Sequence, residues 1–245
     1  MKRIGSAPVF SATPKEPRSD EIAILLQEVP HIVREVVEAH PLAHSMINHV
    51  VANFAANVVL SIGGSPIMSL YGEEAADLAL NNGGLVVNMG TLNSESVSNY
   101  LKAIAAYNER GLSVVYDPVG ASATRIRREA VKQLMRGGYF TLIKGNEGEI
   151  KQVFGKSAER QRGVDSGPST LTHVEKAELA RDLAQRERMC LCPTDPSSMA
   201  LTWLAAGNTV LLTGPVDYLS DGSRTFAIRN GHEYLGQVTG VSHDN

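Results

Sequence analysis

The chain has 245 residues, of which 43% are hydrophobic and 20% charged, enough to bury a sizeable core in one large α/β domain or two small ones. Its formal net charge is −3, and basic residues are interleaved with acidic ones, which argues against nucleic acid as a partner. The sequence contains no apolar run long enough for a membrane span or a signal peptide, so we predict a cytoplasmic protein without a membrane anchor.

The N-terminal part of the sequence predicts a tail followed by helices. Residues 1–18 contain three prolines and no periodic apolar pattern, which predicts a tail or linker. Ser19 can cap an amphipathic helix, and Pro30 should kink or split that helix. A second helix is predicted from about Asn48 to Leu60, and residues 65–68 are predicted to form a short strand or its exit loop.

The middle of the chain alternates between apolar runs and amphipathic segments. Each apolar run lacks polar alternation, which is typical of a parallel strand buried on both faces. Together the segments predict βαβ units and a mainly parallel sheet with helices on both faces. We predict strands over 83–90, 112–120 and 139–146, and helices over 73–82, 94–111, 124–138 and 147–155.

The C-terminal part of the sequence predicts a helix, a strand and a hairpin. A charged helix is expected from about His173 to Arg188, followed by a strand within residues 208–217. Turn signals at Asp221-Gly222 and Asn230-Gly231 are flanked by short apolar stretches. This pattern predicts a hairpin added to one edge of the sheet.

Ligands of open α/β sheets bind beyond the carboxyl ends of the strands, so residues that directly follow each strand are the candidates. Asp117 follows one strand and is itself followed by Pro-Val-Gly, which forces the chain to leave the sheet abruptly. A carboxylate there suits Mg²⁺ held together with a nucleotide. A turn or helix-cap aspartate explains the pattern equally well.

Asn146 and Glu149 lie three residues apart after the next strand, on one face of a first helical turn. They can orient Mg²⁺ and its waters over a triphosphate, with Lys144 adding positive charge. Alternatively, Asn146 caps the helix and Glu149 completes a capping box, which is the reading favoured when this motif is considered alone.

Considered together, several strand ends supply a carboxylate, an amide and an ammonium group to one edge, and Thr213-Gly214 adds a hydroxyl and free backbone after a further strand. Phosphoryl transfer requires such positioning and charge neutralisation. Neither the dinucleotide-binding G-x-G-x-x-G motif after a strand nor the P-loop motif occurs, which argues against a dehydrogenase and a P-loop enzyme.

Several motifs together resemble the hydroxyethylthiazole kinase family, ribokinase-like enzymes of thiamine biosynthesis and salvage. The likeness runs in order from about Pro41 to Gly240 and looks most like the kinase half of the fungal bifunctional protein, in which a thiamine-phosphate synthase domain precedes the kinase. The motifs are HPLAHSMINHVVANFAANVVLSIGGSPIMS, VVNMGTLNSESV, YDPVGASATRIRREA, IKGNEGEI, the GVD of QRGVDSG, LLTGPVDYLSDG and NGHEYLGQVTG.

The resemblance implies a ribokinase-like α/β fold and ATP-dependent phosphorylation of the hydroxyl of 4-methyl-5-(2-hydroxyethyl)thiazole, with Mg²⁺ and a homotrimer that has the thiazole site between subunits. The residue pattern adds Asn146 to the contacts with ATP. The resemblance assigns the thiazole site to Met68, Asn48 and Gly240, the ATP contacts to Lys144 and Thr213, and the Mg²⁺ side to Asp117 and Glu149.

The sequence departs from the family pattern at two places. The family's cysteine, which lies where related sugar kinases keep a catalytic aspartate, is replaced by His243, and the family's last helices are missing. We therefore expect residues 19–245 to form an incomplete, C-terminally truncated kinase domain with no assigned catalytic residue. Residues 190–207 are expected to be an insertion, and we hypothesise that they and the last five residues are translated non-coding sequence or a mispredicted gene product.

Three hypotheses follow. The first is the thiazole kinase itself, and the second is a catalytically inactive fragment that binds ligand or joins family subunits. The third is another ribokinase-like kinase that acts on a pyrimidine or a sugar. Product formation from ATP, Mg²⁺ and candidate alcohols separates them.

Overall fold

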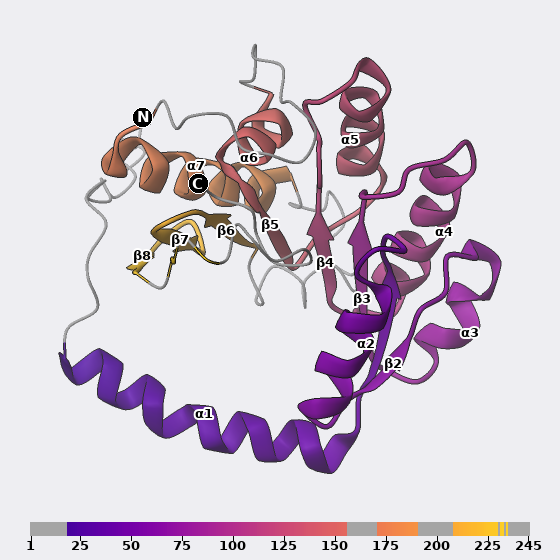
Figure 1. Cartoon of the computed structure of the whole chain (residues 1–245), viewed down its shortest axis with the longest axis horizontal. Coiled ribbons are helices and arrows are strands. Elements are labelled where there is room, and N and C mark those ends of the chain that lie inside the picture. The colour runs from indigo at the N-terminus through magenta and orange to yellow at the C-terminus, as the bar shows by residue number, and fades with distance from the viewer. Residues whose placement is uncertain (1–18, 156–170, 191–207, 230, 233, 235–245) are drawn as a thin grey trace, which may run out of the picture.

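The computed structural model describes residues 19–155, 171–190, 208–229, 231, 232 and 234 (Figure 1). Within these residues a single eight-stranded sheet has the order β2-β1-β3-β4-β5-β6-β7-β8. The first six strands are parallel, and β7 pairs antiparallel with β6 and β8. The strands are β1 (Leu42–Met46), β2 (Ser65–Ile67), β3 (Gly84–Asn88), β4 (Val114–Asp117), β5 (Leu142–Asn146), β6 (Thr209–Thr213), β7 (Asp217–Ser220) and β8 (Thr225–Ile228).

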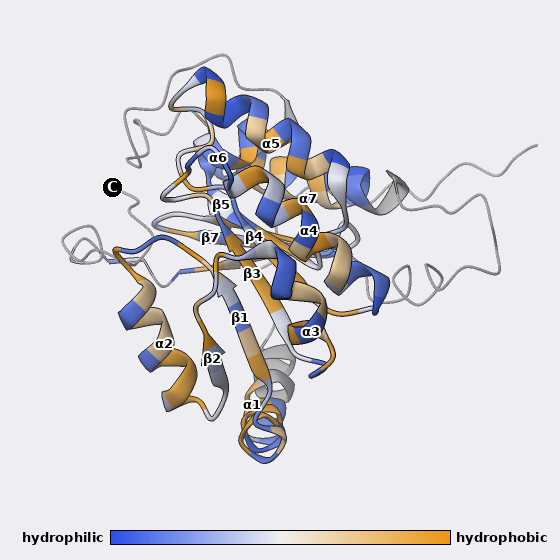
Figure 2. Cartoon of the chain, turned by 90° about the vertical axis from the view of Figure 1, so that its right-hand side faces the viewer, coloured by the Kyte–Doolittle hydropathy of each residue, from blue (hydrophilic) through white to orange (hydrophobic). Residues whose placement is uncertain are grey.

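Helices lie on both sides of this sheet, which confirms the predicted α/β class. Helices α3 to α7 each pack against the next, and α2 lies on the other side of the strands, against β2 (Figure 2). None of the helices in the described ranges is long and apolar enough to cross a membrane. The helices are α1 (Ser19–Ala39), α2 (Ala52–Ser61), the 3-10 turn η1 (Gly72–Glu74), α3 (Ala75–Ala79), α4 (Ser96–Glu109), α5 (Arg125–Gly137), α6 (Glu147–Phe154) and α7 (His173–Cys190).

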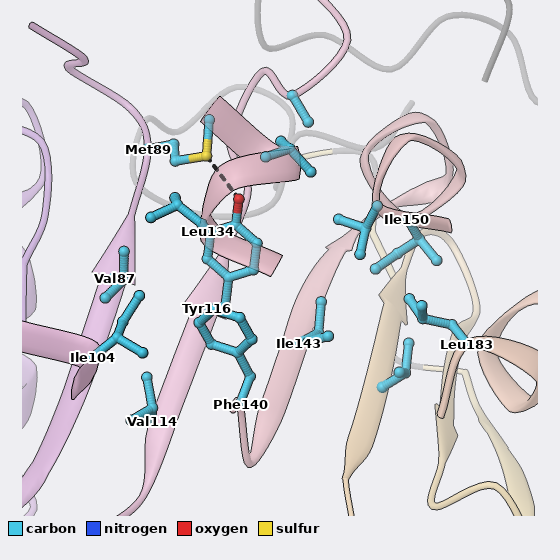
Figure 3. Close-up of a cluster of buried hydrophobic side chains, with 14 of the residues drawn as sticks. Val87, Met89, Ile104, Val114, Tyr116, Leu134, Phe140, Ile143, Ile150 and Leu183 are labelled. Carbon is cyan, nitrogen blue, oxygen red and sulfur yellow. Dashed lines mark hydrogen bonds between the residues drawn. The ribbon is translucent and has the colours of Figure 1, made fainter. Parts of the chain in front are cut away.

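The core fills the space between the strands and helices α3 to α7. Residues along β3, β5 and β6 alternate between buried and half-buried, because successive side chains of a strand point to opposite faces. Tyr116 stacks on Phe140 with ring centroids 4.7 Å apart, and its hydroxyl donates to the Met89 sulfur at 2.8 Å (Figure 3). This packing fixes the end of β3 beside the end of β4.

The N-terminal elements differ from the sequence-based expectations at the start of the second helix, at Pro30 and in one additional strand. The second helix begins at Ala52, because the Asn48 side chain accepts hydrogen bonds from the Val50 and Val51 amides and forms a turn before the helix. Of the two effects expected of Pro30, a split does not occur: α1 runs unbroken from Ser19 to Ala39 with Pro30 inside it, since one proline removes a single backbone hydrogen bond and the remaining turns keep theirs. Strand β1, which the sequence did not predict, lies between β2 and β3.

The C-terminal hairpin is confirmed for the first of its two turns. Strands β7 and β8 are antiparallel, and between them the Asp221 carboxylate accepts from the Ser223 and Arg224 amides. Gly222 has φ +84, a conformation that glycine adopts without strain. The predicted tail (1–18) and residues 191–207 of the predicted insertion lie outside the described residues.

Candidate functional site

Parallel pairing brings the predicted site residues of three strands to one edge of the sheet. Asp117 ends β4, Asn146 ends β5 and Thr213 ends β6. Asn146 and Thr213 are register partners, and Asp117 is the register partner of Asn88 at the end of β3. We call this edge, with Lys144 and Glu149, the rim. The prediction that these residues lie at one edge of the sheet is therefore confirmed.

Asp117 lies on the β4 side of the rim and has one oxygen unpaired among the described residues. Its Oδ2 accepts a hydrogen bond from Asn88 Nδ2 at 2.8 Å and lies 3.6 Å from Lys144 Nζ. Its Oδ1 is buried and has no hydrogen-bond partner in the part of the chain that the structure describes. A buried carboxylate oxygen without a donor is costly, and a bound cation would satisfy it.

Asn88 is a rim residue that the sequence reasoning missed. Its Oδ1 accepts from Asn48 Nδ2 at 3.1 Å, while its Nδ2 donates to Asp117. Asn48, which the resemblance assigns to the thiazole pocket, is thus linked to Asp117 through one side chain. The sequence does contain a signal that could have identified it: Asn88 is a polar residue at the end of an apolar strand, as Asp117 is.

Glu149 is held by backbone amides and is buried. Its Oε2 accepts from the Asn146 amide and its Oε1 from the Gly120 amide, both at 2.9 Å. Asn146 Oδ1 accepts in return from the Glu149 amide, so the capping box that the sequence left open is present. This box does not exclude a ligand role, because each carboxylate oxygen accepts more than one hydrogen bond.

Charge at the rim is unbalanced. Burial, and then the negative charge of Asp117, raise the pKa of Glu149 to about 7, although the Asn146 and Gly120 amides and Lys144 favour its ionised form. Among the residues that the structure describes, Asp117 and Glu149 thus share the ammonium group of Lys144. A divalent cation fits this donor set, with its remaining ligands supplied by water or phosphate. Within the described ranges, no group of three or more His, Cys, Asp or Glu side chains is arranged so that it could hold a metal ion.

The raised pKa of Glu149 predicts a pH-dependent stability of the metal-free chain. The pKa is about 7 in the folded state and 4.5 ordinarily, so the folded state binds more protons between these values. Its free energy of unfolding should therefore fall, by up to about 3 kcal/mol, as the pH rises from 4.5 through 7. Urea unfolding with a chelator present should show this fall relative to Glu149→Gln. Parallel pH curves for the two proteins would contradict it.

Lys144 and Thr213 lie on either side of Asn146. Lys144 is half-buried on β5, and the exposed fraction of its side chain is 31%. Thr213 is buried at the end of β6, and the next residue, Gly214, donates its amide to Asp217 at 3.0 Å. The rim therefore combines an ammonium group, a hydroxyl and two carboxylates, as the sequence predicted. The backbone at Gly214, which was expected to be free, is instead bonded to Asp217 through its amide.

Met68 lies apart from the rim residues along the sheet, after the edge strand β2. It lines a surface hollow of about 590 Å³, and none of the rim residues lines this hollow. Its other lining residues are Ile67, Ser69, Leu70, Tyr71, Glu74, Asn93, Glu95 and Asn99. Gly240, the remaining predicted site residue, and His243, which occupies the family's cysteine position, lie outside the described residues.

Comparisons with known proteins agree on one family. The model of the hydroxyethylthiazole kinase family matches residues 33–195. The hydroxyethylthiazole kinase of Alkaliphilus oremlandii is 33% identical over 217 residues, 89% of this chain and 72% of that protein. That of Pyrococcus furiosus is 37% identical over 213 residues, 87% of this chain and 72% of that protein. The solved structure of the hydroxyethylthiazole kinase protein from Pyrococcus horikoshii matches with a TM-score of 0.68 and 34% identity, over 86% of this chain and 70% of that one.

Proposed function

This chain belongs to the hydroxyethylthiazole kinase family, and on that premise we propose that it transfers the γ-phosphoryl group of ATP to the hydroxyl of 4-methyl-5-(2-hydroxyethyl)thiazole. In this reaction the hydroxyl oxygen bonds to phosphorus, the bond to ADP breaks and the hydroxyl proton is released. The observation that carries the proposal is the rim, where Asp117, Lys144 and Glu149 meet in a chain that matches the family.

The proposed roles follow from the chemistry of each group. Lys144, Asn146 and Thr213 would bind the phosphates of ATP, since phosphoryl transfer depends on positioned donors and positive charge. Asp117 and Glu149 would hold Mg²⁺, and the unpaired Asp117 Oδ1 fits this ion. When bound, Mg²⁺ supplies charge neutralisation to the phosphates.

The thiazole would lie near Met68, with Asn48 and Gly240 contributing. The hollow at Met68 supports this assignment, because it combines apolar and amide side chains. The group that takes up the hydroxyl proton is not assigned. We also propose that residues 1–18 form a tail and that residues 19–245 form one kinase-like domain. We propose that the protein acts in the cytoplasm, where ATP is supplied.

Turnover tests the proposal directly. The purified chain is incubated with ATP, Mg²⁺ and the thiazole alcohol, and the phosphorylated product is measured by mass spectrometry. A pyrimidine alcohol and a sugar serve as competitors, and preference for either would favour the third hypothesis. Thermal stabilisation by ATP or thiazole without product would instead support the inactive, ligand-binding fragment.

We further propose that the chain forms homo-oligomers, a trimer by resemblance. The support is a set of exposed large apolar side chains on and beside helices α1 and α2, and Figure 2 shows hydrophobic residues along α2. The exposed large apolar residues on and beside these helices are Leu26, Val29, Ile32, Val33 and Val37 of α1, with Val50, Phe54, Val58, Leu60 and Ile62 on and beside α2.

An added charge on α2 should weaken this association. Val58 is 43% exposed, and Val58→Asp would place a carboxylate within the contact at a desolvation cost. We expect the sedimentation-equilibrium mass to shift toward the monomer at micromolar concentration. Asn57→Asp, which adds the same charge at an exposed polar position of α2, is the control. A monomeric wild type would contradict the proposed assembly.

A further inference from the structure

Arg127 joins the segment that follows β3 to the segment that follows β4, beside the rim. It lies in the first turn of α5, and its Nη1 donates to the carbonyl oxygens of Met89 at 2.6 Å and Val119 at 2.8 Å. Its Nη2 donates to the Gly90 carbonyl at 2.6 Å. The start of a helix disfavours a cation, and burial lowers the pKa of Arg127. Three charge-assisted hydrogen bonds offset these costs.

Two of the three carbonyls belong to peptides whose amide ends face the rim. The Gly90 amide, in the same peptide as the Met89 carbonyl, donates to Asn88 Oδ1 at 2.9 Å. The Gly120 amide, in the same peptide as the Val119 carbonyl, donates to Glu149 Oε1 at 2.9 Å. The carbonyl and amide of a trans peptide point in opposite directions. A guanidinium on the carbonyl side therefore fixes each amide toward its acceptor, which is Asn88 for the Gly90 amide and Glu149 for the Gly120 amide.

The peptide between residues 119 and 120 would otherwise have two accessible orientations. It is the middle peptide of a turn closed by a hydrogen bond from the Ala121 amide to the Pro118 carbonyl, and Gly120 has φ +67. Positive φ at this third position is the type II arrangement, and rotation of the middle peptide gives type I. That rotation would turn the carbonyl toward Glu149, and Arg127 opposes it.

The other peptide acts through Asn88. The Gly90 amide and Asn48 Nδ2 both donate to Asn88 Oδ1, so the Asn88 amide nitrogen is left to donate to Asp117 Oδ2. Asn88 would present its oxygen to Asp117 if flipped, which two acceptors would disfavour. The 89–90 peptide thus helps to determine that the amide nitrogen of Asn88, and not its oxygen, contacts Asp117.

We propose that Arg127 is a positioning residue of the kinase: by binding the carbonyl ends of the 89–90 and 119–120 peptides, it aims their amide ends at Asn88 and Glu149 and so orients both acids of the rim. This role rests on the proposed function, because it assumes that Asp117 and Glu149 serve phosphoryl transfer. The peptide geometry itself does not depend on that assumption.

Amide signals test the geometry without any turnover. In Arg127→Met, the Gly90 and Gly120 amide protons should shift upfield and exchange at least about tenfold faster, because the amides lose their fixed acceptors. Arg128→Met is the matched control, since Arg128 is the next residue and its Nη1 donates to a different carbonyl, that of Ser122, at 2.8 Å. Unchanged Gly90 and Gly120 signals in folded Arg127→Met would overturn the inference.

Kinetics test the role. Arg127→Met should lower kcat about 10²-fold, as expected for displaced catalytic groups, while KM for the thiazole alcohol changes less than about twofold. The loss should be smaller in a Glu149→Gln background, because the two residues act through one peptide. A general structural defect would instead give additive losses, and additivity would overturn the inference.

Arg127→Lys covers the case in which the methionine variant does not fold. Lysine keeps the charge but lacks the planar fork that serves two peptides, so kcat should stay about tenfold or more below the wild type. Wild-type kcat in Arg127→Lys would contradict the positioning role. If the wild type itself shows no turnover, the proposed function fails, whereas the amide signals still decide the geometry.

Discussion

Replacing Asp117 by asparagine is expected to lower kcat by about 10³-fold while the chain stays folded. Asparagine has the same shape and can still accept the hydrogen bond from Asn88. It removes the negative charge that faces Lys144 and the buried oxygen that a cation would satisfy. Initial rates measured across a range of Mg²⁺ concentrations, together with thermal unfolding, check both parts of this expectation.

The control for this substitution is Asp77→Asn. Asp77 is an exposed aspartate on α3 and is not one of the rim residues, so its replacement should leave kcat unchanged. A folded Asp117→Asn protein with near wild-type kcat at saturating Mg²⁺ would remove Asp117 from the proposed mechanism. It would also remove the main support for a cation at the rim.

Replacing Gly83 by alanine is expected to lower the free energy of unfolding by about 3 kcal/mol or more. A Cβ at this position would lie 1.9 Å from the Leu42 carbonyl oxygen and 2.8 Å from its carbonyl carbon. These are backbone atoms at the start of the neighbouring strand, so they cannot turn away as a flexible side chain would. Relief requires β1 and β3 to separate, which would displace Asn48 and Asn88 as well.

Gly84 offers a matched control for this prediction. A Cβ there would meet only the Ser113 carbonyl oxygen at 3.8 Å, an ordinary contact. Gly84→Ala should therefore change the free energy of unfolding by less than about 1 kcal/mol. Urea unfolding curves of the two variants give the comparison. Equal stability of the two would mean that the close approach of β1 to β3 does not constrain residue 83.

Strand β1 was not predicted because its sequence lacks the uninterrupted apolar run of a buried parallel strand. Its sequence, LAHSM, contains His44 and Ser45, which interrupt the apolar run by which the other parallel strands were predicted. Both are buried in the folded chain, and His44 Nε2 pairs with the Ser69 carbonyl oxygen at 3.1 Å. A polar residue can occupy a buried strand when a distant residue satisfies it, and a local pattern does not reveal that partner.

The role of Arg127 could not be predicted from the sequence for a different reason. It is one of several arginines in α5, and the sequence contains nothing that separates it from Arg125 or Arg128. Its role depends on carbonyl groups in two loops, one of them 38 residues away along the chain. Backbone acceptors carry no sequence signature, because every residue has one.

The sequence by itself determined the alternation of strands and helices, the parallel sheet and the rim residues Asp117, Lys144, Glu149 and Thr213. These follow from local rules: apolar runs form buried strands, and the polar residues that end them meet at the carboxyl edge. Only the tertiary structure decided that Asn88 joins Asn48 to Asp117 and that Arg127 orients two peptides. Such contacts depend on how separate elements approach one another in space, which local periodicity does not encode.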